Sequence, residues 1–355
     1  MKVAVGFSGG VDSAMVALML KEQGHDVVGI TMSLWDPSFN IPLGAKGCFG
    51  PQEVFTLEQT QKTAQKLGIE HVIVPLAKQY RKAVIDYFRD EYKVGRTPNP
   101  CVKCNQLMKF GFLLDSAREL GVDFDYFATG HYAVIENEEF LKCAKDPSKD
   151  QTYFLSRLKK EQLKKVLFPL GNFLKEDVKK LAVEKGFEEL VQKGESQDFI
   201  QCGDYSLLFE EKDLLPGDFV NTKGEVLGRH KGIIHYTIGM RKGLGIGGLK
   251  EALYVIRLDP VKNQVVLGTH PELFSKTLLA SEFNNLAIPL DQKNGKAKVK
   301  IRHGKNLADA EYSWTDSGSL SLVFDSPQAS VTPGQIVCLY QEDTVLGSAI
   351  IDSAL

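Results

Sequence analysis

A segment rich in glycine and hydroxyl side chains lies near the N-terminus, from Ser8 to Ser13 (SGGVDS). It follows an apolar run at 3–7 that predicts a buried strand, and it precedes a helical pattern. Glycines let the backbone turn tightly, and N–H groups at a helix N-terminus favour an anion. Ser8 and Ser13 can add hydroxyl donors, and Asp12 can hold a Mg²⁺ that bridges phosphates. The segment therefore predicts a phosphate site, although Asp12 and Ser13 could instead only cap the helix.

Three cysteines form the second group with potential chemistry. Cys101 and Cys104 make a Cys-x-x-Cys pair, and Cys202 lies in a polar segment that is typical of a loop. Pro98 and Pro100 should keep the chain extended up to Cys101, after which a helical pattern begins. A helix N-terminus and a neighbouring lysine both lower the pKa of a thiol. We therefore expect Cys104 to be a thiolate that acts as a nucleophile or a metal ligand.

Three kinds of site remain open for these cysteines. A structural zinc site needs four ligands, so Cys48 would have to join Cys101, Cys104 and Cys202. The other two are sulfur transfer by thiol and persulfide, and an iron–sulfur cluster held by three cysteines. Spacing alone favours zinc, because Cys-x-x-Cys is so often half of a metal site. Cys143 and Cys338 lie in apolar strand-like runs, and we expect them to be inert core residues.

The elements that position these residues alternate between strand and helix. Strands are predicted at 3–7, 26–32, 71–76 and 124–129, and helices near 53–67, 78–90 and 106–120. The stretch 156–186 predicts two helical pieces, which are separated at 168–171. Such alternation predicts a mostly parallel sheet with helices on both faces, whose ligands bind beyond the carboxyl ends of the strands.

The pattern changes after about residue 205, where glycines and short alternating strands replace the long helices. Strands are predicted at 219–221, 225–227, 252–257 and 263–267, then at 297–302, 310–314, 319–324, 336–341 and 345–351. From about 275 onward we expect only short strands, which form a small β-barrel or sandwich. The predicted domains are 1–204, a nucleotide-binding α/β domain; 205–272, a small mixed domain; and 273–355, a C-terminal β-barrel.

Composition excludes few classes of function. The chain has 355 residues, enough for two or three domains, and its formal net charge of −2 says little about partners. The six cysteines do not suggest a disulfide framework in a chain of this length. The sequence has neither a signal-peptide pattern nor an apolar run near the roughly 20 residues that span a bilayer. We therefore expect a cytoplasmic protein without a membrane partner.

Taken together, these motifs resemble those of the tRNA-specific 2-thiouridylases, in the N-type ATP pyrophosphatase superfamily. The resemblance runs from end to end and includes the Ser8–Ser13 segment. It also implies an adenine nucleotide alpha hydrolase-like fold for the first domain. The matching segments are Gly6–Ser13, Gly95–Asn105, Ala128–Tyr132, Lys149–Leu155, Phe168–Gly171, Gly228–Gly232, Tyr236–Ile246, Pro333–Gln335 and Val345–Gly347.

The resemblance implies a reaction, its cofactors and its binding residues. ATP, with Mg²⁺, would adenylate the 2-oxygen of the wobble uracil, and sulfur would then displace AMP after pyrophosphate has left. The residues implied for ATP are Gly6, Phe7, Ser8, Gly9, Gly10, Val11, Asp12, Ser13, Met32 and Gly130. Those implied for the target base are Asn99, Pro100 and Cys101, and those implied for other parts of the tRNA are His131, Lys149, Asp150, Gln151, Arg302, His303 and Gln335.

The resemblance also assigns the sulfur chemistry, with two departures. Cys104 matches the nucleophile, and Cys202 would carry the persulfide and form a transient disulfide with Cys104. A gapless match places Ile200 at the persulfide position, but Cys202, two residues later, lies on the same face of an extended segment. Many relatives have aspartate where this chain has Cys101. The third sulfur favours a [4Fe-4S] cluster on Cys101, Cys104 and Cys202.

The implied partners are the anticodon stem-loop of tRNA and a sulfur donor, either a persulfide relay protein or free sulfide. Two rival functions remain. One is another ATP-adenylating ligase or amidotransferase of the superfamily, which would not need three converging cysteines. The other is a non-catalytic, cluster-bearing protein that binds tRNA.

Overall fold

The structure is a computed structural model that describes residues 1–43, 47–192, 199–200, 204–247, 251–304 and 306–355. It contains two compact units. The first comprises Met1–Val84, Cys101–Gly203 and Asp343–Val345, and the second comprises Ile85–Pro100, Asp204–Glu342 and Leu346–Leu355. No helix among the described residues is both long enough and apolar enough to cross a membrane.

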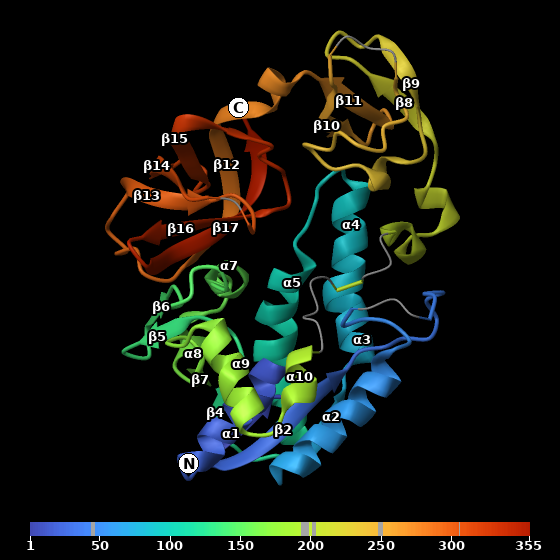
Figure 1. Ribbon diagram of the computed structural model, residues 1–355. Coiled ribbons are helices and arrows are strands. Elements are labelled where there is room, and N and C mark those ends of the chain that lie inside the picture. Colours follow the sequence, from blue (N-terminus) through green and yellow to red (C-terminus); the bar gives the residue numbers. More distant parts are fainter. Residues whose placement is uncertain (44–46, 193–198, 201–203, 248–250, 305) are drawn as a thin grey trace. The chain divides into compact units, whose positions relative to one another are not determined.

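The first unit is built on a five-stranded sheet in the order β3-β2-β1-β4-β7 (Figure 1). The strands are β1 (Lys2–Gly6), β2 (Asp26–Ser33), β3 (Glu70–Pro75), β4 (Tyr126–Ala128) and β7 (Val166–Leu167). Each neighbouring pair is parallel, which confirms the predicted parallel sheet. The strand order reverses direction beside β1, so the loops after β1 and β4 leave the same edge of the sheet, where ligands of such folds bind.

Helices cover both faces of this sheet (Figure 1). The helices between residues 11 and 192, apart from α4, are α1 (Val11–Glu22), α2 (Glu53–Leu67), α3 (Ala77–Tyr80), α5 (Pro100–Lys103), α6 (Leu113–Glu119), α7 (Thr152–Leu155), α8 (Lys160–Leu163), α9 (Lys175–Glu184) and α10 (Glu188–Gln192), with a π-helical segment, η2 (Cys104–Phe112), between α5 and α6. A second π-helical segment, η1 (Arg81–Asp86), leads into α4 (Tyr87–Lys93). α1 packs against both α2 and α9, whereas α6 packs against β2 and β3 from the opposite face.

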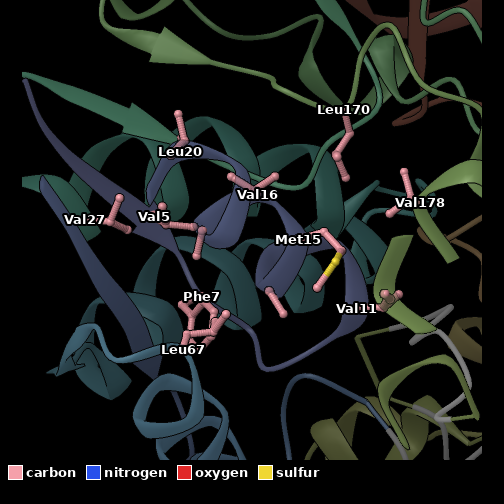
Figure 2. Close-up of a cluster of buried hydrophobic side chains, with 14 of the residues drawn as sticks. Val5, Phe7, Val11, Met15, Val16, Leu20, Val27, Leu67, Leu170 and Val178 are labelled. Carbon is pink, nitrogen blue, oxygen red and sulfur yellow. The ribbon is translucent and has the colours of Figure 1, made fainter. Parts of the chain in front are cut away.

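The core between α1 and the sheet fixes the start of that helix. Figure 2 shows Val5 near Val16 of α1 and Phe7 beside Leu67 of α2, and Met15 of α1 and Val178 of α9 belong to the same buried cluster. Fully burying each such side chain contributes about 1.5–3 kcal/mol. The Ser8–Ser13 segment is therefore held at both ends by buried elements.

Three short strands and one helix boundary differ from the predictions. The predictions lacked β7 and a hairpin of β5 (Val134–Glu136) and β6 (Phe140–Lys142). These strands have two or three residues each, too few to give a visible alternation of polar and apolar side chains. The helix before Cys104 begins at Pro100, so Cys101 is helical and not extended; proline is favoured at the first position of a helix.

The second unit contains a four-stranded sheet in the order β10-β11-β8-β9. Its strands are β8 (Gly217–Val220), β9 (Val226–His230), β10 (Tyr254–Asp259) and β11 (Gln264–Gly268), and its 3₁₀ turns are η3 (Tyr205–Leu208), η4 (Glu211–Asp213), η5 (Ile233–His235) and η6 (His270–Leu273). β11 pairs with β8 in parallel, and the other two pairs are antiparallel. The strands lie within three residues of their predicted positions.

The same unit contains the C-terminal β-barrel. Its strands are β12 (Phe274–Asn285), β13 (Asn294–Lys300), β14 (Ala308–Trp314), β15 (Leu320–Ala329), β16 (Ile336–Gln341) and β17 (Thr344–Ala354). β12 pairs with both β15 and β17, which closes the barrel. The prediction of short strands was wrong for β12, β15 and β17, which have 12, 10 and 11 residues. The register of β12 shifts along its length, and such bulges bend a strand and interrupt its alternation.

Candidate active site

Hydrogen bonds to its own serine hydroxyl groups fix the conformation of the Ser8–Ser13 segment, which we call the phosphate loop. The Ser8 amide donates to Ser13 Oγ at 3.2 Å, and Ser13 Oγ donates to the Gly10 carbonyl at 3.1 Å. Gly9 has φ +69°, and a Cβ there would lie 2.5 Å from Thr60 Oγ1. Only glycine fits at that position. The loop connects β1 to α1, as expected, and the first N–H groups of α1 have no partner within the helix.

Asp12, in the first turn of α1, lies between two groups from other parts of the first unit. Lys175 Nζ is 2.8 Å from Asp12 Oδ1 and 2.7 Å from Oδ2. The Tyr132 hydroxyl donates to Asp12 Oδ1 at 2.9 Å. The carboxylate therefore does more than cap a helix, because its oxygens accept from side chains more than a hundred residues away.

Lys175 is a residue of this site that could not be singled out from the sequence. It was one lysine within the lysine-rich stretch 156–186, and its neighbours gave it no distinction. One signal was present: Lys175 is the first residue of α9, where a cation is unfavourable beside the positive end of the helix dipole. A lysine in that position is stabilised by a partner outside its own helix, which here is Asp12.

Gly130 and Met32, both implied for the nucleotide, lie at the carboxyl edge of the sheet. A Cβ on Gly130 would lie 2.8 Å from Asp12 Cβ and 3.1 Å from the Ser13 amide nitrogen. Gly130 therefore allows the loop after β4 to lie directly against the phosphate loop. Met32 is the penultimate residue of β2 and pairs in register with Val74.

A carboxylate that the sequence analysis did not consider orders the loop after Met32. Glu53 Oε2 accepts from Ser33 Oγ at 2.7 Å, and Glu53 Oε1 accepts from the Trp35 amide at 3.0 Å. Glu53 begins α2, so the start of one helix fixes the end of β2.

Cys104 lies at the first residue of the π-helical segment and is buried. Burial raises the pKa of its thiol to about 12, although nearby Lys109 acts in the opposite direction. The expected lowering of this pKa is wrong. The helix starts at Pro100, a full turn before Cys104, and desolvation is the largest cause of the shift.

The thiols of Cys48, Cys101 and Cys104 all lie close enough to the Tyr80 hydroxyl to affect its pKa. The Tyr80 hydroxyl is fully buried, and no protein hydrogen bond of ordinary geometry reaches it among the described residues. Burial, followed by the thiols of Cys48, Cys104 and Cys101, raises the pKa of Tyr80 well above its usual value. Phe49 stacks on the Tyr80 ring with centroids 5.3 Å apart. The described part of the chain contains no group of three or more His, Cys, Asp or Glu side chains that could hold a metal ion.

Cys202 lies outside the described residues, so the structure does not address its role. The nearest described residues upstream are anchored: the Phe199 carbonyl accepts from the Phe49 amide at 3.1 Å and lies 3.8 Å from Cys48 Sγ. Cys338 is fully buried in β16, and Cys143 is half-buried after β6. Cys338 is thus the core residue that the sequence analysis expected.

The segment implied for tRNA in the first unit makes several internal contacts. Asp150 Oδ1 accepts from the Ala144 amide at 3.1 Å, and Gln151 Oε1 accepts from the Tyr132 amide at 2.9 Å. His131 is buried, its Nδ1 lies 2.7 Å from Thr129 Oγ1, and burial holds its pKa well below the usual value. Contacts of Lys149, Asp150, Gln151 and His131 with tRNA stay predictions.

Comparison with known proteins covers the whole chain. The family described as tRNA methyl transferase HUP domain matches residues 1–202, the tRNA methyl transferase PRC-barrel domain matches 208–269, and the aminomethyltransferase beta-barrel domain matches 275–351. The tRNA-specific 2-thiouridylase MnmA of Acetivibrio thermocellus is 44% identical, with 99% of each chain covered. The chain belongs to the tRNA-specific 2-thiouridylase family.

Other members of the 2-thiouridylase family show the same end-to-end similarity. The MnmA of Endomicrobium trichonymphae is 42% identical over 99% of both chains. That of Clostridioides difficile is 39% identical and covers 100% of this chain and 99% of its own. The three matched families also agree with the expected fold class: a nucleotide-binding α/β domain, a small middle domain and a terminal β-barrel.

In this 2-thiouridylase-family chain, Gln335 of the second unit binds the backbone of residues 97 and 98. Its side-chain amide donates to the Thr97 carbonyl at 2.8 Å and to the Pro98 carbonyl at 3.2 Å. The Thr97 amide donates to the Pro333 carbonyl at 2.8 Å. The backbone just before Asn99 and Pro100 is therefore fixed by the residues that surround Gln335.

Arg302 and His303, the other two positions of the second unit implied for tRNA, lie in the turn after β13. Arg302 is half-buried, and His303 is exposed. Neither distance nor orientation assigns them a ligand, so their role stays a prediction.

Proposed function

We propose that this protein catalyses the ATP-dependent 2-thiolation of the wobble uridine in tRNA, with release of AMP and pyrophosphate. The observation that carries the proposal is end-to-end similarity to enzymes named tRNA-specific 2-thiouridylase, at 44% identity over 99% of the chain. The folded phosphate loop and the buried Cys104 belong to the same compact unit, which supports an adenylation step followed by a sulfur step.

In the proposed first step, residues Gly6–Ser13, Met32 and Gly130 bind ATP. The uracil 2-oxygen attacks the α-phosphate, and pyrophosphate leaves. This converts a poor leaving group, a carbonyl oxygen, into an adenylate ester. The oxygens of Asp12, Ser8 and Ser13 suit Mg²⁺, which prefers one or two carboxylates together with phosphate oxygens. Mg²⁺ bound there would neutralise charge on the phosphates.

In the proposed second step, a persulfide on Cys202 supplies the sulfur. Its terminal sulfur bonds to C2 of the activated base, and AMP leaves with the former 2-oxygen. The Cys104 thiolate then attacks Cys202 Sγ, so that the S–S bond to the transferred sulfur breaks and 2-thiouridine is released. Cys104 and Cys202 end as a disulfide, which a dithiol reductant must return to two thiols. A relay protein that carries a persulfide is the donor in this version.

The alternative sulfur chemistry uses a [4Fe-4S] cluster on Cys101, Cys104 and Cys202, with free sulfide as donor. The third cysteine of this chain favours it. Anaerobic purification, an absorption spectrum and a count of iron and sulfide separate the two versions. A broad visible band with bound iron supports the cluster, and a colourless, iron-free protein that still thiolates tRNA supports the persulfide.

For recognition, we propose that the protein binds the anticodon stem-loop with the target base turned out of its stack. Asn99, Pro100 and Cys101 would face that base. Contacts to the rest of the tRNA would come from Lys149, Asp150, Gln151, His131, Arg302, His303 and Gln335. The proposed domain boundaries are 1–204 for catalysis, and 205–272 and 273–355 for holding tRNA.

The deciding experiment measures pyrophosphate, AMP and thiolated tRNA with purified protein, ATP, Mg²⁺, unmodified tRNA and a sulfur donor. The proposal expects all three products, and expects Asp12→Asn to abolish all three. Pyrophosphate formation without thiolated tRNA, unchanged by serine at positions 101, 104 and 202 together, would indicate another adenylating enzyme. tRNA binding without either nucleotide product would indicate the non-catalytic alternative.

A further inference from the structure

Lys175 is unusual for a lysine because only 3% of it is exposed. Lysine is almost never fully buried unless it is paired. Its ammonium contacts both carboxylate oxygens of Asp12, at 2.8 and 2.7 Å. The pair joins the first turn of α1 to the first residue of α9.

Both ends of the Lys175 residue are fixed. Its backbone amide donates to Asp146 Oδ2 at 3.0 Å, which secures the start of α9. Its ammonium lies 5.5 Å from the centre of the Tyr132 ring, and the hydroxyl of that tyrosine also binds Asp12. The ammonium is therefore held beside the phosphate loop by a rigid arrangement and not by a flexible side chain.

The Asp12 carboxylate and the Lys175 ammonium balance each other's charge while they are paired beside the phosphate loop. Both Asp12 oxygens accept from the ammonium, and Oδ1 also accepts from the Tyr132 phenol, so a metal ion would have to share this carboxylate with Lys175. Mg²⁺ that enters with ATP competes with Lys175 for the same carboxylate. If Asp12 held Mg²⁺ there, the ammonium would share its carboxylate with the metal. A phosphate oxygen would then be a suitable further partner for the ammonium, because its charge is compact.

We propose that Lys175 is a pyrophosphate-binding residue of the ATP site, which exchanges its contact with Asp12 for the β- and γ-phosphates when magnesium and nucleotide bind. This inference rests on the proposed function, since it needs ATP at the phosphate loop. Asp12 and Lys175 act together in this scheme, because the ion pair keeps the buried ammonium in place until the phosphates arrive.

The first test is calorimetric binding of Mg²⁺-pyrophosphate and, separately, of AMP to the full-length protein. Lys175→Met should weaken pyrophosphate binding by about ten- to a hundredfold and leave AMP binding unchanged. Lys179→Met is the matched control, because Lys179 lies in the same helix and forms an ion pair with the exposed Glu176. Equal pyrophosphate affinity in the Lys175→Met variant and the wild type would overturn the inference.

The second test uses pyrophosphate without magnesium and remains informative if Lys175→Met folds poorly. Asp12→Asn removes the carboxylate that competes with phosphate for Lys175 in the ion pair described above, so this variant should bind metal-free pyrophosphate more tightly than the wild type. The double variant Asp12→Asn, Lys175→Met, which carries no buried unpaired charge at these two positions, should lose that gain. If Asp12→Asn gains nothing, the ion pair is only a structural link between α1 and α9, and the inference fails.

Failure of the inference and failure of the proposed function give different results. If wild-type protein binds ATP and pyrophosphate but Lys175→Met does so equally well, only the role of Lys175 is lost. If the wild type binds neither ATP, AMP nor pyrophosphate, the proposed nucleotide site itself is wrong.

Discussion

The side-chain amide of Gln335 donates a hydrogen bond to the backbone carbonyl of Thr97, 238 positions earlier in the sequence. A second bond reaches the Pro98 carbonyl, so one amide group holds two successive peptide units. Prolines at 98 and 100 cannot donate backbone hydrogen bonds. The segment before Asn99 consequently depends on side chains such as Gln335 for its conformation.

Replacing Gln335 by leucine should loosen residues 97–98. Two buried or half-buried carbonyls would lose their donor, at a cost of about 1–3 kcal/mol. We expect a lower melting temperature and a several-fold loss of tRNA thiolation, with ATP binding unchanged. Gln328→Leu is the control, because the Gln328 amide binds the nearby Ser326 carbonyl at an exposed site. Identical behaviour of the two variants would contradict a positioning role for Gln335.

Cys104→Ser should abolish sulfur transfer and preserve nucleotide binding. A serine hydroxyl cannot take part in thiol–disulfide exchange, so thiolated tRNA should fall by roughly a thousandfold or more. Radiolabelled sulfur incorporated into tRNA measures the loss, and calorimetry with ATP measures folding and binding. Cys143→Ser, a half-buried cysteine of the same unit, should thiolate normally. Full activity of Cys104→Ser would remove Cys104 from the sulfur chemistry.

The raised pKa of Cys104 predicts slow alkylation of this thiol in the folded protein. With a pKa of about 12 in place of 9.0, its thiolate fraction at pH 8 is about a thousandfold lower than that of an ordinary thiol. Iodoacetamide followed by peptide mass spectrometry should label exposed Cys48 well before Cys104. Unfolding in denaturant should equalise the two rates.

The raised pKa of Cys104 also makes the free energy of unfolding depend on pH. Between about pH 9 and pH 12 the folded protein holds a proton on Cys104 that the unfolded chain releases. The contribution of this thiol to the free energy of unfolding is therefore constant below pH 9 and falls as pH rises toward 12. Denaturant titrations of wild type and Cys104→Ala should diverge in that range. If the free energies of unfolding of the two proteins changed in parallel with pH across this range, the pKa of the Cys104 thiol would not be raised.

Gly130→Ala should weaken ATP binding without affecting the distant parts of the fold. The new methyl group would lie 2.8 Å from Asp12 Cβ, so the start of α1 must move. Crowding of this kind typically costs about 1–3 kcal/mol, and we expect about a tenfold loss of ATP affinity by calorimetry. Gly111→Ala is the control, because its nearest neighbour would be at an ordinary 3.7 Å. Equal affinity in both variants would mean that the loop accommodates the methyl group.

Local sequence was sufficient wherever neighbouring residues decide the structure. The order of residues 3–13 predicts a strand, a tight loop and a helix, because apolar content, glycine and helix capping act over a few positions. The parallel sheet followed from repetition of that unit. The cysteine pair was visible for the same reason, since both sulfurs lie within one helical turn.

Only the tertiary structure decided which distant groups share a site. Lys175 meets Asp12 because α9 packs on α1, and no local pattern encodes that packing. Cys104 has a raised pKa because the folded chain removes water from its sulfur, which outweighs the helix and lysine beside it in sequence. The long bulged strands of the barrel form because each pairs with partners far along the chain. Charge and spacing are properties of the sequence, whereas burial and long-range pairing exist only after the chain has folded.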